Sequence, residues 1–275
     1  MVSQNDSPSR PSHRWVTPSV AAAVIAALSV ALPALAATGS AGQMGYDVSY
    51  PQCTGSTMGS APITAGAFDI LGANGGLTYA ANPCLAAEYS WASGGRAVVS
   101  FYANTGNPGP QSAHWPVGQQ IPEVCPVLKH YRPGTSAFDA CSYDYGYDAA
   151  EDSFTDVQTA TSSSIGQAAQ WWLDIESANS WTRSTEANNA DIQGALAYFQ
   201  QNTSARYVGI YTNSSSWSSI TGSTERFRSY PFWAPGATLA TAAATCGSSS
   251  ASVTGGHIRY AQYQVGNFDD DYDCG

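Results

Sequence analysis

The chain has 275 residues and a formal net charge of −10 at pH 7, from 20 acidic and 10 basic side chains. Such an acidic surface repels nucleic acid and weakly repels anionic cell-wall polymers, which argues against nucleic-acid binding and against tight electrostatic binding to a wall. The sequence also lacks the GxxxxGK loop of nucleotide-binding proteins and the GxSxG elbow of serine esterases.

The N-terminal segment has the order of an export signal. Two arginines precede an apolar run over residues 20–32, and the small-residue site Ala-Leu-Ala follows at residues 34–36. The run is broken by Ser29, so it falls short of the roughly 20 continuous apolar residues that a membrane anchor needs. We therefore expect residues 1–36 to be a cleaved signal peptide and residues 37–275 to be a single secreted, extracellular domain without membrane contact.

Short apolar segments alternate with stretches of helical character in the rest of the chain, which is the pattern of βα units around a parallel sheet. The 239 residues after residue 36 are close to the roughly 250 that one eight-stranded α/β barrel uses. The fold class expected is therefore α/β, a single TIM-like (β/α) barrel. Strands are predicted over residues 44–49, 68–73, 96–102, 170–176, 207–211, 232–235 and 258–264, and helices over residues 83–93, 149–163, 184–201 and 214–220.

One long segment departs from this alternation. Six prolines between residues 104 and 147 break any long helix or strand, so this segment is predicted to be a long loop insertion. Loops of this length are usually functional or disordered. Cys125 and Cys141 lie inside it and indicate a stapled, ordered loop.

Cysteines indicate three disulfides, because an exported chain reaches an oxidising compartment. Six cysteines allow 15 pairings. Short loops close at the least entropic cost, which favours Cys53 with Cys84, Cys125 with Cys141, and Cys246 with Cys274. No C-x-x-C or H-E-x-x-H motif occurs and the histidines are scattered, so neither a metal site nor a cofactor is expected.

The segment Trp171-Trp172-Leu173-Asp174-Ile175-Glu176 is an apolar run that ends in two acids. Side chains alternate along a strand, so Asp174 and Glu176 should face the barrel interior while Leu173 and Ile175 face the helices. Two carboxyls in a partly dry site raise each other's proton affinity, and one can then act as a general acid. The alternative is a solvated pair that merely caps the next helix, because such tripeptides are common.

Further acids fall at the ends of the first and last predicted segments of the barrel. Asp47 lies in the first strand, and Asp269, Asp271 and Asp273 alternate along residues 268–273. The first and last strands of a closed barrel are neighbours. These acids are therefore expected to meet the D-x-E pair at one end of the barrel.

With these motifs, the chain resembles glycoside hydrolase family 25, the muramidases whose barrel carries an N-terminal G-x-D-x-S, a central D-x-E and a C-terminal Q-Y with a trailing Asp. Here the motifs are Gly45-Tyr46-Asp47-Val48-Ser49, Asp174-Ile175-Glu176, and Gln262-Tyr263 with the acidic residues that follow. The resemblance runs from about Gly45 to the last residue of the sequence. Ala261 stands where members often place tryptophan, and the proline-rich insertion is longer than the family leads us to expect.

The resemblance implies a carboxylate mechanism. Glu176 would be the general acid, and Asp174 would stay ionised to stabilise the sugar cation or hold the N-acetyl group of the substrate. Asp47 and a tail acid, Asp271 or Asp273, would position and polarise the site. The expected function is a secreted glycoside hydrolase of peptidoglycan-type N-acetylated glycan. The alternative is a catalytically silent barrel that binds cell-wall glycan or a protein partner.

Aromatic residues could supply stacking platforms for sugar rings. The candidates are Tyr102, Trp115, Tyr211, Trp233 and Tyr263, joined by Gln262 from the family motif. For each ring the alternative is core packing, because aromatic side chains bury a large apolar area. Trp171 and Trp172 are expected to pack, since adjacent strand residues cannot both face the interior.

Overall fold

The computed structural model describes residues 41–59, 64–204, 208–266 and 268–275. The predicted signal peptide lies outside the described residues. The described residues group into one compact unit. Within the described ranges, no helix is both long enough and apolar enough to cross a membrane.

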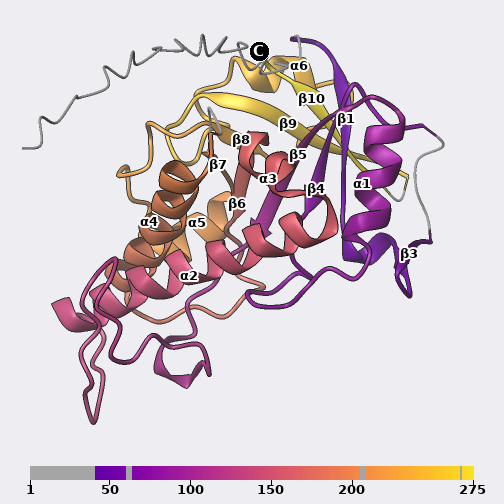
Figure 1. The fold of residues 1–275 in the computed structure, drawn as a ribbon. Helices are drawn as coiled ribbons and strands as arrows, with labels where there is room; N and C mark the ends of the chain where they lie inside the picture. The colour runs from indigo at the N-terminus through magenta and orange to yellow at the C-terminus, as the bar shows by residue number, and fades with distance from the viewer. Residues whose placement is uncertain (1–40, 60–63, 205–207, 267) are drawn as a thin grey trace, which may run out of the picture. The chain divides into compact units, whose positions relative to one another are not determined.

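Eight strands close into a barrel, which confirms the predicted architecture (Figure 1). Strands β1 to β9 of the barrel run parallel, and β10 runs antiparallel to both of its neighbours, β9 and β1. In barrel order the strands are β1 (Met44–Val48), β4 (Phe68–Gly72), β5 (Val98–Asn104), β6 (Trp171–Asp174), β7 (Val208–Tyr211), β8 (Phe232–Ala234), β9 (Ile258–Val265) and β10 (Phe268–Asp273).

The sheet of the barrel is mixed, because its last strand runs antiparallel to both neighbours. β9 ends at Val265 and β10 begins at Phe268. So short a connection can only reverse the chain, whereas a parallel crossover needs a dozen or more residues. The acidic residues 268–273 are therefore a barrel strand hydrogen-bonded along its length and not a tail.

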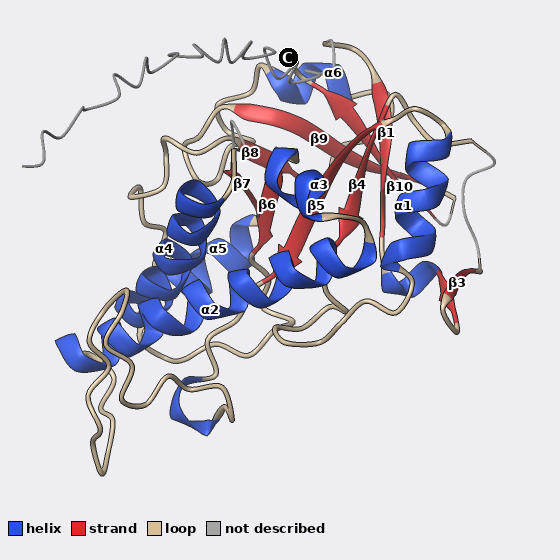
Figure 2. Ribbon diagram, in the orientation of Figure 1, coloured by secondary structure: helices blue, strands red, loops and turns tan. Residues whose placement is uncertain are grey.

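Six helices and a small ribbon complete the described fold (Figure 2). The predicted helices near residues 83–93, 184–201 and 214–220 are confirmed within a few residues at each end. The helices are α1 (Leu85–Gly94), α2 (Ser136–Ala160), α3 (Ser163–Ala168), α4 (Thr185–Asn202), α5 (Ser214–Thr221) and α6 (Ala242–Cys246), with 3-10 turns η1 (Tyr50–Gln52) and η2 (Gly109–Gln111) and a ribbon of β2 (Cys53–Thr54) and β3 (Thr57–Met58).

The predicted boundary between long loop and helix was wrong. Helix α2 begins at Ser136, so residues 136–147 are helical although they were expected to be loop. The proline series ends at Pro133, and the Thr135 side chain then accepts a hydrogen bond from the Phe138 amide at 3.3 Å. A threonine N-cap followed by a stretch without proline allows a helix to start soon after the last proline.

All three predicted disulfides are present: Cys53–Cys84, Cys125–Cys141 and Cys246–Cys274. The second of these ties the long loop to helix α2. Trp115 packs beside it against Phe138 and Tyr145, and the indole is only 7% exposed. The loop is therefore ordered at its base, and Trp115 serves packing in place of sugar stacking.

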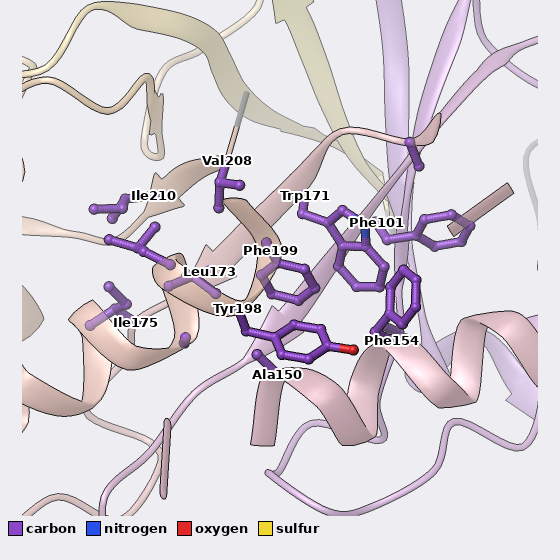
Figure 3. Close-up of a cluster of buried hydrophobic side chains, with 14 of the residues drawn as sticks. Phe101, Ala150, Phe154, Trp171, Leu173, Ile175, Tyr198, Phe199, Val208 and Ile210 are labelled. Carbon is purple, nitrogen blue, oxygen red and sulfur yellow. The ribbon is translucent and has the colours of Figure 1, made fainter. Parts of the chain in front are cut away.

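The main apolar core lies between the barrel and helices α2 and α4. Trp171, Leu173 and Ile175 of the β6 segment point into it (Figure 3). The ring of Trp171 stacks on that of Phe199 of α4, with the ring centroids 4.3 Å apart. Trp172 faces the other way and packs inside the barrel with Phe68, Ile70, Trp233 and Tyr260. This alternation confirms that Leu173 and Ile175 face the helices.

Candidate active site

The predicted acids gather at the carboxyl ends of the parallel strands. Asp174 is the last residue of β6 and Glu176 follows two residues later. Asp47 lies near the end of β1, where it pairs in register with Asp269 of β10. Asp271 lies deeper on β10, opposite Gly45 and Gln262. In barrels of this kind the carboxyl ends of the strands carry the chemistry.

Asp174 is a buried carboxyl with one hydrogen-bonded oxygen. Its side chain is 7% exposed, Asn104 Nδ2 donates to its Oδ2, and its Oδ1 has no partner within the described residues. Burial raises the pKa of Asp174 well above its usual value, and the charges of Glu176 and Asp47 add to the rise. The hydrogen bond from Asn104 acts in the opposite direction, because it stabilises the ionised form.

Glu176 is the more accessible acid of the pair. Its carbonyl oxygen accepts a hydrogen bond from Trp181 Nε1 at 2.8 Å, which fixes the backbone where the strand leaves the barrel. Burial raises the pKa of its side chain, while a hydrogen bond with Asn213 lowers it. The Oδ1 of Asn213 caps α5 by accepting from Ser216 N at 2.8 Å, which leaves its amide nitrogen for Glu176. A partly exposed carboxyl with a raised pKa is suited to general acid catalysis.

Asp47 and Asp271 form a second acidic pair. Asp47 Oδ2 accepts from Gln262 Nε2 at 2.9 Å, and Asp271 Oδ1 accepts from Trp233 Nε1 at 2.6 Å. Burial raises the pKa of Asp47 to about 7, with a further rise from the charge of Asp269. Burial first and the charge of Asp47 second raise the pKa of Asp271 well above its usual value. Carboxyls placed in this way titrate as a pair and share a proton when one of them is protonated.

Three further predicted residues surround these acids. Tyr211 donates a hydrogen bond to Gln262 Oε1 at 2.9 Å, and its electrostatic neighbours are Glu176, Asp174 and Asp47. The Tyr102 hydroxyl is hydrogen-bonded to Ser49 and lies near Asp47 and Asp174. Both tyrosines are half-buried. Tyr102, Tyr211 and Gln262 are thus placed to contact a ligand that reaches the acids.

Trp233 lies beneath this group. Its indole is 2% exposed and packs against the rings of Tyr211 and Trp172, with centroid distances of 4.7 and 5.9 Å. An indole this deeply buried has no free face for a sugar ring. Trp233 therefore supports Asp271 and the tyrosines from below.

Two predicted residues lie away from the acids. Asp273 is fully buried in a two-pronged ion pair with Arg259, including Nη2 to Oδ2 at 2.9 Å. Its cross-strand neighbour is Tyr260, near the amino end of β9. Tyr263 faces outward from the barrel, where its hydroxyl donates to Met44 Sδ at 3.2 Å. Since side chains alternate along β9, Gln262 and Tyr263 cannot both face the interior.

The sequence did not predict three residues of the site: Asn104, Asn213 and Ser49. Asn104 contacts Asp174, and Asn213 contacts Glu176. Each lies two residues after the end of a predicted strand, where barrels place functional side chains. Their position after a strand was the only signal in the sequence, and it does not distinguish them from the many other asparagines in loops.

A metal-ligand geometry is found at one place in the described residues. Cys53, Cys84 and Glu88 have ligand atoms within 4.8 Å of one another. The two sulfurs are joined in a disulfide, so only one carboxylate is left to bind a metal there.

Comparison with known proteins finds sequence similarity to lysozymes over part of the chain. A family model described as "Lysozyme-like protein 1" matches residues 139–240, a range that includes Asp174 and Glu176. "Probable GH family 25 lysozyme 5" of Dictyostelium discoideum is 40% identical over 63 residues, which are 22% of this chain and 29% of that relative's length.

Solved structures share the fold at low sequence identity. The bacterial lysozyme from Streptomyces coelicolor superposes with a TM-score of 0.52 at 20% identity, covering 86% of this chain and 94% of that one. A muramidase from Acremonium alcalophilum gives a TM-score of 0.51 at 17% identity, covering 84% and 93%. The likeness to both extends through nearly the whole of each barrel.

Proposed function

Since this chain is a lysozyme-like protein of glycoside hydrolase family 25, we propose that it is a secreted hydrolase of peptidoglycan-type N-acetylated glycan. The observation that carries the proposal is the Asp174 and Glu176 pair. Asp174 is buried, and its Oδ1 has no hydrogen-bond partner among the described residues, whereas Glu176 is partly exposed. Burial raises the pKa of both side chains. Cleavage of a glycosidic bond needs two carboxyls with such different roles.

In the proposed reaction, Glu176 donates its proton to the glycosidic oxygen as the bond from that oxygen to the anomeric carbon breaks. The carbonyl oxygen of the substrate's own N-acetyl group attacks the anomeric carbon, and Asp174 accepts a hydrogen bond from the N–H of that group. Water then attacks the anomeric carbon and gives a proton to Glu176, while the bond from that carbon to the N-acetyl oxygen breaks and the N-acetyl group is restored. Acids two residues apart on one strand suit this route better than carboxyls that flank the bond from opposite faces.

Proton placement within the pair follows from its hydrogen bonds. Burial raises the pKa of both Asp174 and Glu176, and the charge of Glu176 raises the pKa of Asp174 further. A substrate N–H would give Asp174 a second donor beside Asn104. Two donors favour the ionised form of Asp174, which leaves the proton on Glu176.

The second acidic pair acts as a fixed support. Asp47 and Asp271, sharing a proton, place one negative charge near the sugar that becomes positive in the transition state. Tyr102, Tyr211 and Gln262 would contact the sugar.

A barrel that binds wall glycan or a protein partner without turnover is the second candidate function. The long loop favours it through exposed apolar side chains that no core residue covers: Val117, Ile121, Val124 and Val127 are 51, 77, 55 and 75% exposed. Exposed apolar groups gathered in one loop mark an interaction surface in many proteins.

The test compares the protein with its Glu176→Gln variant on peptidoglycan and on a chitin-type oligosaccharide, with products identified by mass spectrometry. We expect muramyl reducing ends from the unmodified protein and a loss of about 100-fold or more in the variant, the scale of a lost general acid. Glu225→Gln is the matched control, because Glu225 is exposed and its carboxylate lies 4.0 Å from Arg228 on the surface. If neither the protein nor the control releases product while glycan still binds, the silent barrel is the better account.

A further inference from the structure

The two oxygens of the Asp174 carboxyl have unequal surroundings. Oδ2 accepts a hydrogen bond from Asn104 Nδ2, and Oδ1 has no partner within the described residues. A carboxylate can accept several hydrogen bonds. The side chain is therefore half satisfied: Oδ2 has a donor, while Oδ1 is buried and has none among the described residues.

Asn104 is itself held in place by a second asparagine. Asn74 Nδ2 donates to the Asn104 carbonyl at 3.0 Å, and Asn74 Oδ1 accepts from the Asn104 amide at 3.1 Å. The Asn74 side chain thus pairs with the Asn104 backbone as a neighbouring strand would. Asn74 is fully buried just beyond β4 and also donates to Ser153 Oγ of α2 at 3.3 Å. The chain of contacts runs from helix α2 to Asp174.

The backbone of Asp174 is fixed from the same direction. Asn104 and Asp174 are cross-strand neighbours on β5 and β6. The Asp174 carbonyl oxygen accepts from Thr105 N at 3.0 Å and from Thr105 Oγ1 at 2.9 Å. Two consecutive residues therefore fix both the main chain and the side chain of Asp174, which leaves its carboxyl little freedom to rotate.

We propose that Asn104 is a positioning residue that occupies Oδ2 of Asp174 and reserves Oδ1 for an N–H donor of the substrate, and that Asn74 anchors Asn104. The substrate part rests on the proposed function. The unpaired Oδ1 of Asp174 would favour a sugar that brings an amide N–H to this point. The same sugar with a free amine, protonated and differently shaped, lacks that group. The asparagine pair thus contributes to selection of N-acetylated glycan.

The first test needs no turnover. The carboxyl carbon of Asp174 is followed by 13C NMR through a pH titration of the full chain, with Asp174→Asn used to assign the resonance. In Asn104→Ala the ionised form loses its donor, so the titration midpoint should rise by about one unit or more, a tenfold gain in proton affinity. Asn74→Ala should give a smaller shift in the same direction.

The control is Asn202→Ala, which removes an asparagine at the end of α4 that bonds the Tyr147 hydroxyl at 3.1 Å and has no contact with Asp174. Its midpoint should match that of the unmodified protein. Near-ultraviolet circular dichroism of each variant establishes that it is folded. An unchanged midpoint in folded Asn104→Ala would overturn the proposal.

The second test concerns selection. Binding of chitin and chitosan oligosaccharides of equal length is measured by calorimetry on Glu176→Gln, with and without Asn104→Ala. We expect the preference for the N-acetylated sugar to fall by about tenfold when Asn104 is lost. A preference that stays the same would refute the role of Asn104 in selection. Absence of turnover in the unmodified protein would count against the proposed function alone, because neither test depends on it.

Discussion

Trp233 satisfies one oxygen of a carboxyl that is otherwise sealed inside the barrel. Its Nε1 lies 2.6 Å from Asp271 Oδ1. A buried acceptor that loses its donor costs the desolvation of the group, about 1–3 kcal/mol. Trp233 is therefore expected to stabilise both the fold and the shared proton of the Asp47 and Asp271 pair.

We predict that Trp233→Phe lowers the free energy of unfolding by about 1–3 kcal/mol more than Trp217→Phe does. Both indoles are buried, at 2% and 1% exposure, but Trp217 Nε1 has no hydrogen-bond partner in the described residues. The two substitutions remove the same volume, so the difference between their losses of unfolding free energy measures the hydrogen bond from Trp233 to Asp271. Urea unfolding followed by far-ultraviolet circular dichroism measures it, and equal losses would show that the indole donor contributes nothing.

For single residues, the sequence predicts which acids face the barrel interior better than it predicts how far along the barrel they lie. Alternation correctly places Asp174 toward the interior, but Asp271 and Asp273 have the same parity and cannot be separated by it. Their depth depends on the register of β10 against β9, which brings Asp273 to Arg259. A charged partner 14 residues away in the sequence is visible only in the fold.

Helices α2 and α4 touch backbone to backbone where each has a glycine. A Cβ atom added at Gly146 would lie 2.0 Å from the Asp191 carbonyl oxygen, and one added at Gly194 would lie 1.9 Å from the Tyr143 carbonyl oxygen. The two contacts are reciprocal, so neither helix can move aside without losing the other contact. This crossing holds α2, and with it Ser153 behind Asn74, at a fixed distance from the barrel.

We expect Gly146→Ala to lower the free energy of unfolding by about 1–3 kcal/mol, because backbone atoms must separate to admit a methyl group. Gly94→Ala is the control. An added Cβ there meets nothing within 4 Å, and alanine in a helix is more stable than glycine by about 0.5–1 kcal/mol. Thermal unfolding of both variants measures the contrast. If Gly146→Ala were as stable as Gly94→Ala, the crossing would be looser than described.

Elements with strong local signals were predictable, and those set by neighbours were not. Helix α4 begins at Thr185 after the Ser184 N-cap, whose side chain accepts from the Ala187 amide at 3.3 Å, and the sequence predicts that start within one residue. The direction of β10 depends on the length of the turn before it, and an acidic segment does not read as a strand. To predict the start of α2, the N-cap signal of Thr135 would have had to be preferred over the nearby prolines, which indicate a loop.

The molecule as a whole carries an excess of acids, several of them in its interior. Asp191 of α4 is 1% exposed, and neither of its carboxyl oxygens has a partner in the described part of the chain. Burial raises the pKa of Asp191 well above its usual value. The folded protein therefore holds a proton on Asp191 at pH values where the unfolded chain has released it.

This linkage predicts a loss of stability as pH rises. Below the unfolded pKa of roughly 3.9 both states are protonated and Asp191 has no effect on the free energy of unfolding. Above it the folded state binds more protons than the unfolded state, so stability falls by about 1.4 kcal/mol per pH unit until the folded pKa is reached. Asp191→Asn removes the titrating group and should abolish that loss.

We therefore expect the urea midpoint of Asp191→Asn to exceed that of the unmodified protein at pH 7, by a margin that shrinks toward pH 4. Glu225→Gln, which replaces an exposed acid, should show a nearly constant margin across the same range. A constant margin for Asp191→Asn as well would mean that Asp191 is ionised in the folded protein and finds a counterion or water there.

The seam between β1 and β10 sets the order in which the molecule can become functional. Asp47 and Asp271 stand on opposite sides of it, more than 220 positions apart along the chain, and pair only when the ring of strands closes (Figure 1). Closing so long a loop is entropically late and slow. A nascent or clipped polypeptide that lacks β10 would have the D-x-E pair and Asp47 but not Asp271. Appearance of the shared proton would therefore be a kinetic signal of completed folding, separate from the earlier gain of helices.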